Sequence, residues 1–158
     1  MRISLVFCLG MAALVGIMGC GSDRPADLPE LHPLTIEVTQ DGKPLEGATV
    51  SLYAEGSKWA VGAGTDATGK AVILTLGEYK GAPAGTYKVC VTKELIETSG
   101  EITDDPMAPP VMTENFDLVD PVYKSPETTT LEVEVVAGEN NPPAIDVGPA
   151  IKEPVPQI

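Results

Sequence analysis

The chain is short of the residues from which most active sites are built. Its 158 residues include one histidine, His32, one tryptophan and three cysteines, and only 4% are aromatic. A catalytic triad or a zinc site centred on His32 would need a second histidine or paired cysteines to work with. A phosphate-binding glycine loop and a basic stripe interleaved with aromatics are also missing. We therefore expect no catalytic residue, no metal site and no cofactor, and a protein that is not an enzyme.

Cysteine is too scarce for an intrachain disulfide. Cys8 lies within an apolar N-terminal stretch, Cys20 follows that stretch, and Cys90 stands alone in the rest of the chain. If Cys8 leaves with a leader and Cys20 carries lipid, Cys90 has no partner even in an oxidising compartment. The core must then hold the fold unaided. We expect Cys90 to be a covered, inert thiol rather than a redox site.

Positive charge is also scarce. The chain has 10 basic and 23 acidic residues, for a net charge of −13. All the acidic residues and nine of the basic ones follow Cys20, so the chain from Cys20 onward carries 9 − 23 = −14 when its amino terminus is acylated. Such a chain repels nucleic acid and anionic lipid head groups. A nucleic-acid partner is therefore not expected.

No apolar run is long enough for a typical membrane-spanning helix. The longest, from Ile3 to Met18, reaches roughly 24 Å as a helix, short of the roughly 30 Å hydrocarbon core. It follows the positive start Met1-Arg2 and runs into Ile17-Met18-Gly19-Cys20, which looks like a bacterial lipobox. We expect residues 1–19 to be a lipoprotein signal peptide, cleaved before Cys20, whose sulfur then carries a diacylglycerol.

Ordinary secretion and a retained anchor are the alternatives to this lipobox. An ordinary cleavage site has a small residue three positions before the cut, and Ile17 stands there. The lipobox therefore predicts attachment to a membrane of the cell envelope through lipid, facing the periplasm or the exterior. Gly21, after the cysteine, is not an acidic retention signal and so favours the outer membrane.

The pattern after Cys20 is that of an all-β protein. Residues 20–33 contain three prolines and no apolar repeat, and we expect a lipidated cysteine followed by a proline-rich tether. Short extended runs, most of them alternating apolar and polar residues, predict about seven strands between residues 34 and 147, in a single β-sandwich. Residues 148–158 are expected to form a disordered, proline-rich tail. The predicted strands cover residues 34–39, 49–54, 59–65, 71–76, 87–93, 131–135 and 145–147.

Two turns have a recognisable mechanism. Asp41-Gly42 is the strongest short hairpin signal in the chain. In the second turn, Asp66 can accept backbone N–H bonds two residues on, and Gly69 can adopt a positive φ. We interpret Asp41, Gly42, Asp66 and Gly69 as structural turn residues rather than as ligands.

The stretch from Glu94 to Glu127 is proline-rich and acidic and lacks a clear strand pattern. A loop of this length is unusual inside a small domain. It either contains a short strand around Phe116 to Val119 or forms a real elaboration, which we hypothesise to be a proline-stiffened flap packed along one sheet edge.

The acidic residues of this stretch could bind calcium, with Asp104-Asp105, Glu97 and Glu101 as ligands. The alternating calcium-loop signature is missing, however, and a solvated acidic loop is favoured.

Aromatic residues could still bind a sugar by stacking. Trp59 and Tyr53 are the candidates, with Tyr79 as a further member of such a platform. In a chain this poor in aromatics, a core or half-buried Trp59 is the favoured interpretation.

Four short motifs together resemble one known family. Residues 41–50 (DGKPLEGATV) resemble the opening hairpin of bacterial carboxypeptidase regulatory-like domains, and residues 65–69 (TDATG) and 85–89 (GTYKV) follow in the family's order. Residues 124–129 (KSPETT) look like the small lipoproteins of that group. The resemblance spans residues 34–147 and implies a transthyretin-like (prealbumin-type, Ig-like) β-sandwich without catalytic residues. Ala71 departs from the family pattern, which usually has a larger apolar residue there.

These observations lead to one functional expectation and two rivals. We expect a lipid-anchored module of the cell envelope with a structural or binding role, whose partner is an envelope protein or a polysaccharide. A carbohydrate-binding lipoprotein is the first rival, and an enzyme with a polar cleft and a perturbed carboxylate is the less favoured second.

Overall fold

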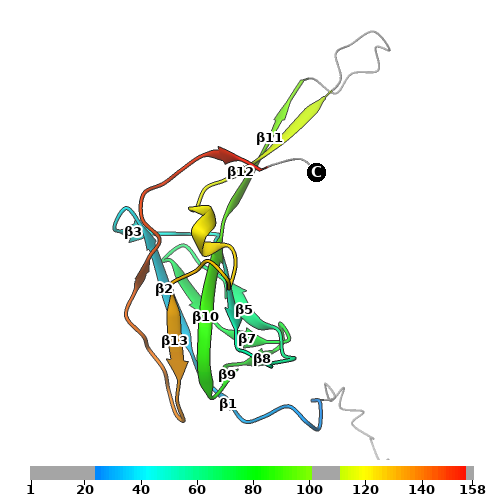
Figure 1. The fold of residues 1–158 in the computed structure, drawn as a ribbon, viewed down its shortest axis with the longest axis vertical. Coiled ribbons are helices and arrows are strands. Elements are labelled where there is room, and N and C mark those ends of the chain that lie inside the picture. Colours follow the sequence, from blue (N-terminus) through cyan, green and yellow to red (C-terminus); the bar gives the residue numbers. More distant parts are fainter. Residues whose placement is uncertain (1–23, 101–110, 156–158) are drawn as a thin grey trace, which may run out of the picture.

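A computed structural model describes residues 24–100 and 111–155 of the chain. In these ranges the protein is built from short strands in several, mainly antiparallel, sheets, with one 3-10 turn and no α-helix (Figure 1). The predicted all-β class is confirmed. None of the described segments is a helix long and apolar enough to cross a membrane.

The largest sheet has six antiparallel strands and includes β10 (Gly85–Thr92), the longest strand among the described residues. β10 pairs with β13 on one side and with β4 on the other, and the sheet continues from β4 through the remaining strands. Its order is β13 (Glu132–Val135), β10, β4 (Thr49–Tyr53), β5 (Val61–Gly64), β7 (Leu74–Thr75) and β8 (Tyr79–Lys80).

A second sheet forms around β2 (Thr35–Gln40). β2 pairs antiparallel with β3 (Lys43–Pro44) and β6 (Lys70–Val72), and parallel with β14 (Ile145–Asp146). The turn between β2 and β3 has φ values of 52° at Asp41 and 70° at Gly42. Two successive left-handed residues are what a two-residue type I′ hairpin requires, which explains the Asp-Gly pair.

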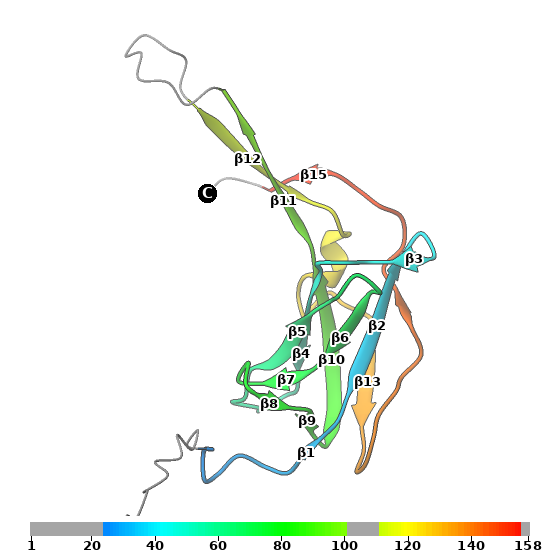
Figure 2. The same ribbon diagram turned by 180° about the vertical axis from the view of Figure 1, so that it is seen from behind.

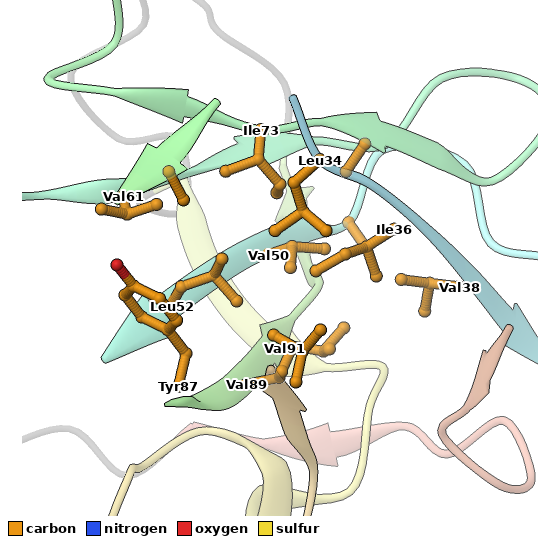
Figure 3. Packing of buried hydrophobic residues seen from close by; sticks show 14 of the residues in the cluster. Leu34, Ile36, Val38, Val50, Leu52, Val61, Ile73, Tyr87, Val89 and Val91 are labelled. Atoms are coloured by element: carbon orange, nitrogen blue, oxygen red, sulfur yellow. The ribbon is translucent and has the colours of Figure 1, made fainter. Parts of the chain in front are cut away.

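The core lies between these two sheets (Figure 3). Alternate residues of β2 and β10, such as Ile36 and Val38 and then Val89 and Val91, are fully buried. Because burying one such side chain contributes about 1.5–3 kcal/mol, the cluster is the main source of stability. The buried apolar members are Leu34, Ile36, Val38, Leu45, Ala48, Val50, Leu52, Val61, Ala71, Ile73, Ala82, Tyr87, Val89, Val91, Val119, Val133, Val135 and Val147.

The predicted strand over residues 71–76 has apolar residues on both faces, so its sequence does not indicate which face is buried. In the structure Ala71, Ile73 and Thr75 are buried, whereas Val72 and Leu76 are exposed. The run also changes sheets, since β6 belongs to the β2 sheet and β7 to the six-stranded one. Ile73, between them, closes one side of the core.

The folded part begins before Leu34, so the expected tether over residues 20–33 is too long. β1 (Leu31–His32) pairs with β9 (Ala82–Pro83), and Leu28 is buried. Gly81 makes this approach possible, because a Cβ built there would lie 2.5 Å from the His32 carbonyl oxygen. Residues at the end of the expected tether are therefore part of the folded structure.

The stretch after Glu94 contains a β-hairpin rather than a flap along a sheet edge. β11 (Glu94–Ser99) and β12 (Met112–Asp117) pair antiparallel, with Glu94 opposite Asp117 and Ser99 opposite Met112. Their outer ends extend away from the rest of the molecule (Figures 1 and 2). We call β11 and β12 together the arm, and the two large sheets with their core the body.

The expectation of a disordered tail is also wrong for the residues that the structure describes. β15 (Glu153–Pro154) pairs antiparallel with β12, opposite Phe116 and Asp117. β15 therefore adds a third strand beside the arm. The arm and β1 lie at opposite ends of the long axis of the described molecule (Figure 1).

Candidate functional site

The Asp66 side chain bonds to residues of its own turn. One Asp66 carboxylate oxygen accepts hydrogen bonds from the Thr68 hydroxyl at 2.7 Å and from the backbone N–H groups of Thr68 and Lys70 at 2.8 and 3.0 Å. These bonds, that from the Thr68 hydroxyl first, hold the pKa of Asp66 below its usual value. Gly69 has a φ of 76°, and a Cβ there would lie 2.5 Å from the Val38 carbonyl oxygen. Asp66 and Gly69 therefore both act as structural residues of the turn.

The Asp41-Gly42 hairpin depends on a residue that sequence reasoning missed. Asp146 accepts hydrogen bonds from the Thr39 hydroxyl at 2.9 Å and from the backbone N–H groups of Gly148 and Gly42 at 2.7 and 3.2 Å. The bond from Gly148 is the main reason that the pKa of Asp146 lies below its usual value. The signal was weak, because Asp146 is 104 residues from Gly42 in the chain.

The aromatic pair does come together, but not as an open platform. Tyr53 and Trp59 line the same hollow of about 150 Å³, and Tyr53 is 49% exposed. Trp59 is half-buried against the core, as expected. The Lys58 ammonium lies 4.7 Å from the centroid of the Trp59 ring and pairs with Asp27. A sugar stacked on that face of Trp59 would have to displace Lys58.

The two scarce reactive residues are both covered. Cys90 is buried, and burial, with the charge of Glu127 as a lesser cause, raises the pKa of its thiol. The 3-10 turn η1 (Pro121–Tyr123) lies over β10, the strand that contains Cys90 (Figure 1). His32 is buried rather than in a free tether, and its Nδ1 accepts a hydrogen bond from the Gly138 N–H at 3.4 Å.

The remaining predicted site residues lie outside the described part of the chain. These are Cys20, the expected lipid attachment site, and Glu101, Asp104 and Asp105 of the possible calcium loop. Glu97, the fourth member of that loop, pairs instead with Lys152 at 2.7 Å. Among the described residues no group of three or more histidine, cysteine, aspartate or glutamate side chains is placed to hold a metal ion.

The arm is the part of the described molecule that most resembles an interaction surface. Every residue of β11 is exposed. Ile96 and Met112, both apolar, are 64% and 60% exposed, and Leu95 and Val111 are exposed as well. An exposed strand with apolar side chains is open to pairing with another chain.

One face of the arm combines apolar and acidic groups. Leu95 lies opposite Phe116, and Glu97 lies opposite Glu114, on the same face because both pairs are two residues apart along each strand. The C-terminal segment crosses this side of the arm, where Lys152 contacts both Glu97 and the ring of Phe116. A hollow of about 410 Å³ is lined by Met112, Thr113, Glu114, Asn115, Phe116, Pro154 and Val155.

A partly buried ion pair fixes the base of the arm. Lys124, just after η1, donates to both carboxylate oxygens of Asp117 at 2.8 and 2.9 Å and lies 3.9 Å from Glu94. The Asp117 side chain is only 8% exposed. Lys124 thus joins the body to the first residue of β11 and the last of β12.

Comparison with known proteins identifies no family for this chain. No family model, curated protein or solved structure matches it.

Proposed function

We propose that this protein is a lipid-anchored binding module of the cell envelope that displays the arm away from its membrane. In this proposal Cys20 carries the lipid, residues 34–147 form most of a transthyretin-like sandwich of the carboxypeptidase regulatory-like type, and the role is binding rather than catalysis. The membrane is the outer one, and the partner is an envelope protein.

The single observation that carries the proposal is the position of the arm. The first described residues, Arg24 to His32, end in β1 at one end of the long axis, and the arm lies at the other (Figure 1). A lipid on Cys20 attaches the chain only four residues before Arg24. The exposed apolar residues of β11 and β12 then lie at the end remote from the attachment point, where a partner can reach them.

The fold and the sequence motifs support the family part of the proposal. Two sheets with a shared core, an Asp-Gly hairpin after the first long strand and an Asx turn at Asp66 agree with the resemblance to carboxypeptidase regulatory-like domains. The arm is an addition to that framework. A small β framework that carries an exposed arm fits a binding role, since binding residues are common on segments that a rigid scaffold positions.

Carbohydrate binding remains the second candidate because Tyr53 and Trp59 share a hollow. Tyr53 also lines a neighbouring hollow of about 540 Å³ that contains the Lys88–Glu132 ion pair. We rank it below the arm, because Lys58 already lies over the Trp59 ring.

Site-specific photo-crosslinking in intact cells tests the proposal. A photoreactive residue is placed at Ile96 of the arm or, as a matched control, at Val72 of the body, which is 54% exposed. We expect a discrete protein adduct from position 96 only, and its loss in the Cys20→Ala variant, which should also leave the detergent phase. Equal adducts from both positions, or none from position 96, would overturn the arm as the binding element. Partitioning of Cys20→Ala into detergent would overturn the anchor.

A further inference from the structure

The arm contains an unfavourable pair of like charges that a lysine relieves. Glu97 of β11 lies directly opposite Glu114 of β12. Like charges at such positions destabilise a strand pair. The ammonium of Lys152, from the C-terminal segment, lies 2.7 Å from a Glu97 carboxylate oxygen. The acidic pair is therefore arranged as an acceptor for a cation brought by another segment.

The same lysine also contacts an aromatic ring. Its ammonium is 4.4 Å from the centroid of the Phe116 ring, a distance typical of a cation–π contact. Phe116 is half-buried and stands two residues from Glu114 on the same face of β12. Ring and carboxylates together recognise a flexible side chain that ends in a positive charge.

Main-chain pairing completes the site. Beyond the lysine, Glu153 and Pro154 pair with Asp117 and Phe116, and the Val155 N–H donates to the Asn115 carbonyl at 2.8 Å. The hollow of about 410 Å³ lies here, with Met112 and Val155 in its lining. The edge of β12 that faces away from β11 thus binds an extended segment as an added strand, one of the general modes of peptide recognition.

The segment that occupies this edge is held by few contacts. Lys152, Glu153 and Pro154 are all exposed, and the two side chains of the Lys152–Glu97 pair are about half exposed. Exposed ion pairs of this kind are weak. A competing segment with the same chemistry can therefore take its place.

We propose that the outer edge of β12 is a peptide-binding groove and that residues 152–155 of this chain close it in cis. The ligand is an extended segment of a partner protein in which a lysine is followed two residues later by proline and then by an aliphatic residue. The described strands of the arm contain four acidic residues and no basic ones. Lys124 already pairs with Asp117 and lies near Glu94 at the base, so Glu97 and Glu114 are the carboxylates that select for a cationic segment. This inference rests on the proposed function, since it names the partner chemistry of the arm.

A peptide with the sequence of residues 150–155 and a fluorescent label tests the groove. The protein is the full chain in detergent, either as the wild type or with Lys152→Glu, which places a third carboxylate beside Glu97 and opens the groove. Lys80→Glu, an equal charge change at an exposed lysine of β8, is the matched control. We expect Lys152→Glu to bind the peptide about tenfold more tightly than the wild type and Lys80→Glu do. This factor follows if residues 152–155 close the groove in about nine of ten wild-type molecules, because only the open tenth can then bind the peptide.

Two further protein variants and one altered peptide define the contacts. In the Lys152→Glu background, Phe116→Ala and Glu97→Gln should each weaken peptide binding, and a peptide with glutamate in place of its lysine should not bind. Glu97→Gln keeps the inference testable if Phe116→Ala disturbs the arm. No peptide binding, or equal binding by Lys152→Glu and Lys80→Glu, would overturn the groove. A persisting crosslink at position 96 would then leave the proposed function standing, whereas peptide binding without that crosslink would overturn the function alone.

Discussion

The body and the arm are both antiparallel β-structure, yet they bury their side chains very differently. In β2 of the body, Ile36 is fully buried between two sheets. In β11 of the arm, Ile96 has the same side chain and is 64% exposed. The body is therefore stabilised by its core, and the arm by main-chain pairing and a few side-chain contacts.

The difference teaches how an exposed hairpin is kept in place. A hairpin by itself is marginally stable in water. Here the arm continues β10 across a single residue, Lys93, whose carbonyl accepts a hydrogen bond from the Leu118 N–H at 2.8 Å. Lys124 holds Asp117 at the base, and β15 adds a third strand. The arm is thus fixed at the body, and the side chains of β12 become more exposed from Asp117 at the base to Met112 at the outer end.

Truncating one isoleucine in each region is the strongest test of this contrast. Ile36→Ala removes a fully buried side chain and should lower the free energy of unfolding by about 2–5 kcal/mol. Ile96→Ala should change it by less than about 0.5 kcal/mol, because its site is already exposed. Urea denaturation of both variants, followed by circular dichroism, gives the comparison. Similar losses in the two variants would mean that the arm is packed against something in the free protein.

Breaking the ion pair at the base of the arm should have a smaller and more local effect. Lys124→Met leaves the Asp117 carboxylate, which is 8% exposed, without its cation, at a cost of about 1–3 kcal/mol. Hydrogen exchange should accelerate at Leu95, Phe116 and other arm amides more than in the core strands.

The matched control for this change is Lys88→Met. Lys88 pairs with Glu132 at 2.8 Å, but both side chains are about half exposed, so its loss should cost less than about 1 kcal/mol. Faster exchange throughout the body in Lys124→Met, or none in the arm, would contradict a role of Lys124 as the link between the two regions.

The same contrast explains which parts of the fold could be predicted from the sequence. The body strands were predicted because a half-buried strand alternates apolar and polar residues, as in Leu34 to Thr39, and its two turns because Asp-Gly and Asp66 carry local signals. β11 reads Glu-Leu-Ile-Glu-Thr-Ser and is exposed on both faces, so burial imposed no alternation on it. The expected flap was wrong for this reason.

Long-range polar contacts were the other source of error. Asn140 begins a stretch with the composition of a turn, yet it is buried, and its side chain bonds to the backbone of Pro33, Val136 and Gly138. Lys152 pairs with Glu97 across 55 residues of chain, and β15 pairs with β12 at a similarly long range. Single residues that pair at such distances leave no local pattern, which is why the tail was expected to be disordered and the candidate groove was not predicted.

The smallest effect that we predict is acid sensitivity in one turn of the body. Hydrogen bonds from Thr68 and Lys70 hold the pKa of Asp66 below its usual value, so folding favours the ionised form. The stability that this group contributes is present above the pKa of about 3.9 in the unfolded chain and is lost as the pH falls through the lower pKa of the folded state. Asp66→Asn keeps an acceptor for the turn but does not titrate. Wild type should therefore be more stable than Asp66→Asn at pH 6, and the two urea midpoints should converge toward pH 3. If the difference between the two urea midpoints stays constant with pH, the negative charge of Asp66 does not stabilise the body, and its side chain acts only as a hydrogen-bond acceptor.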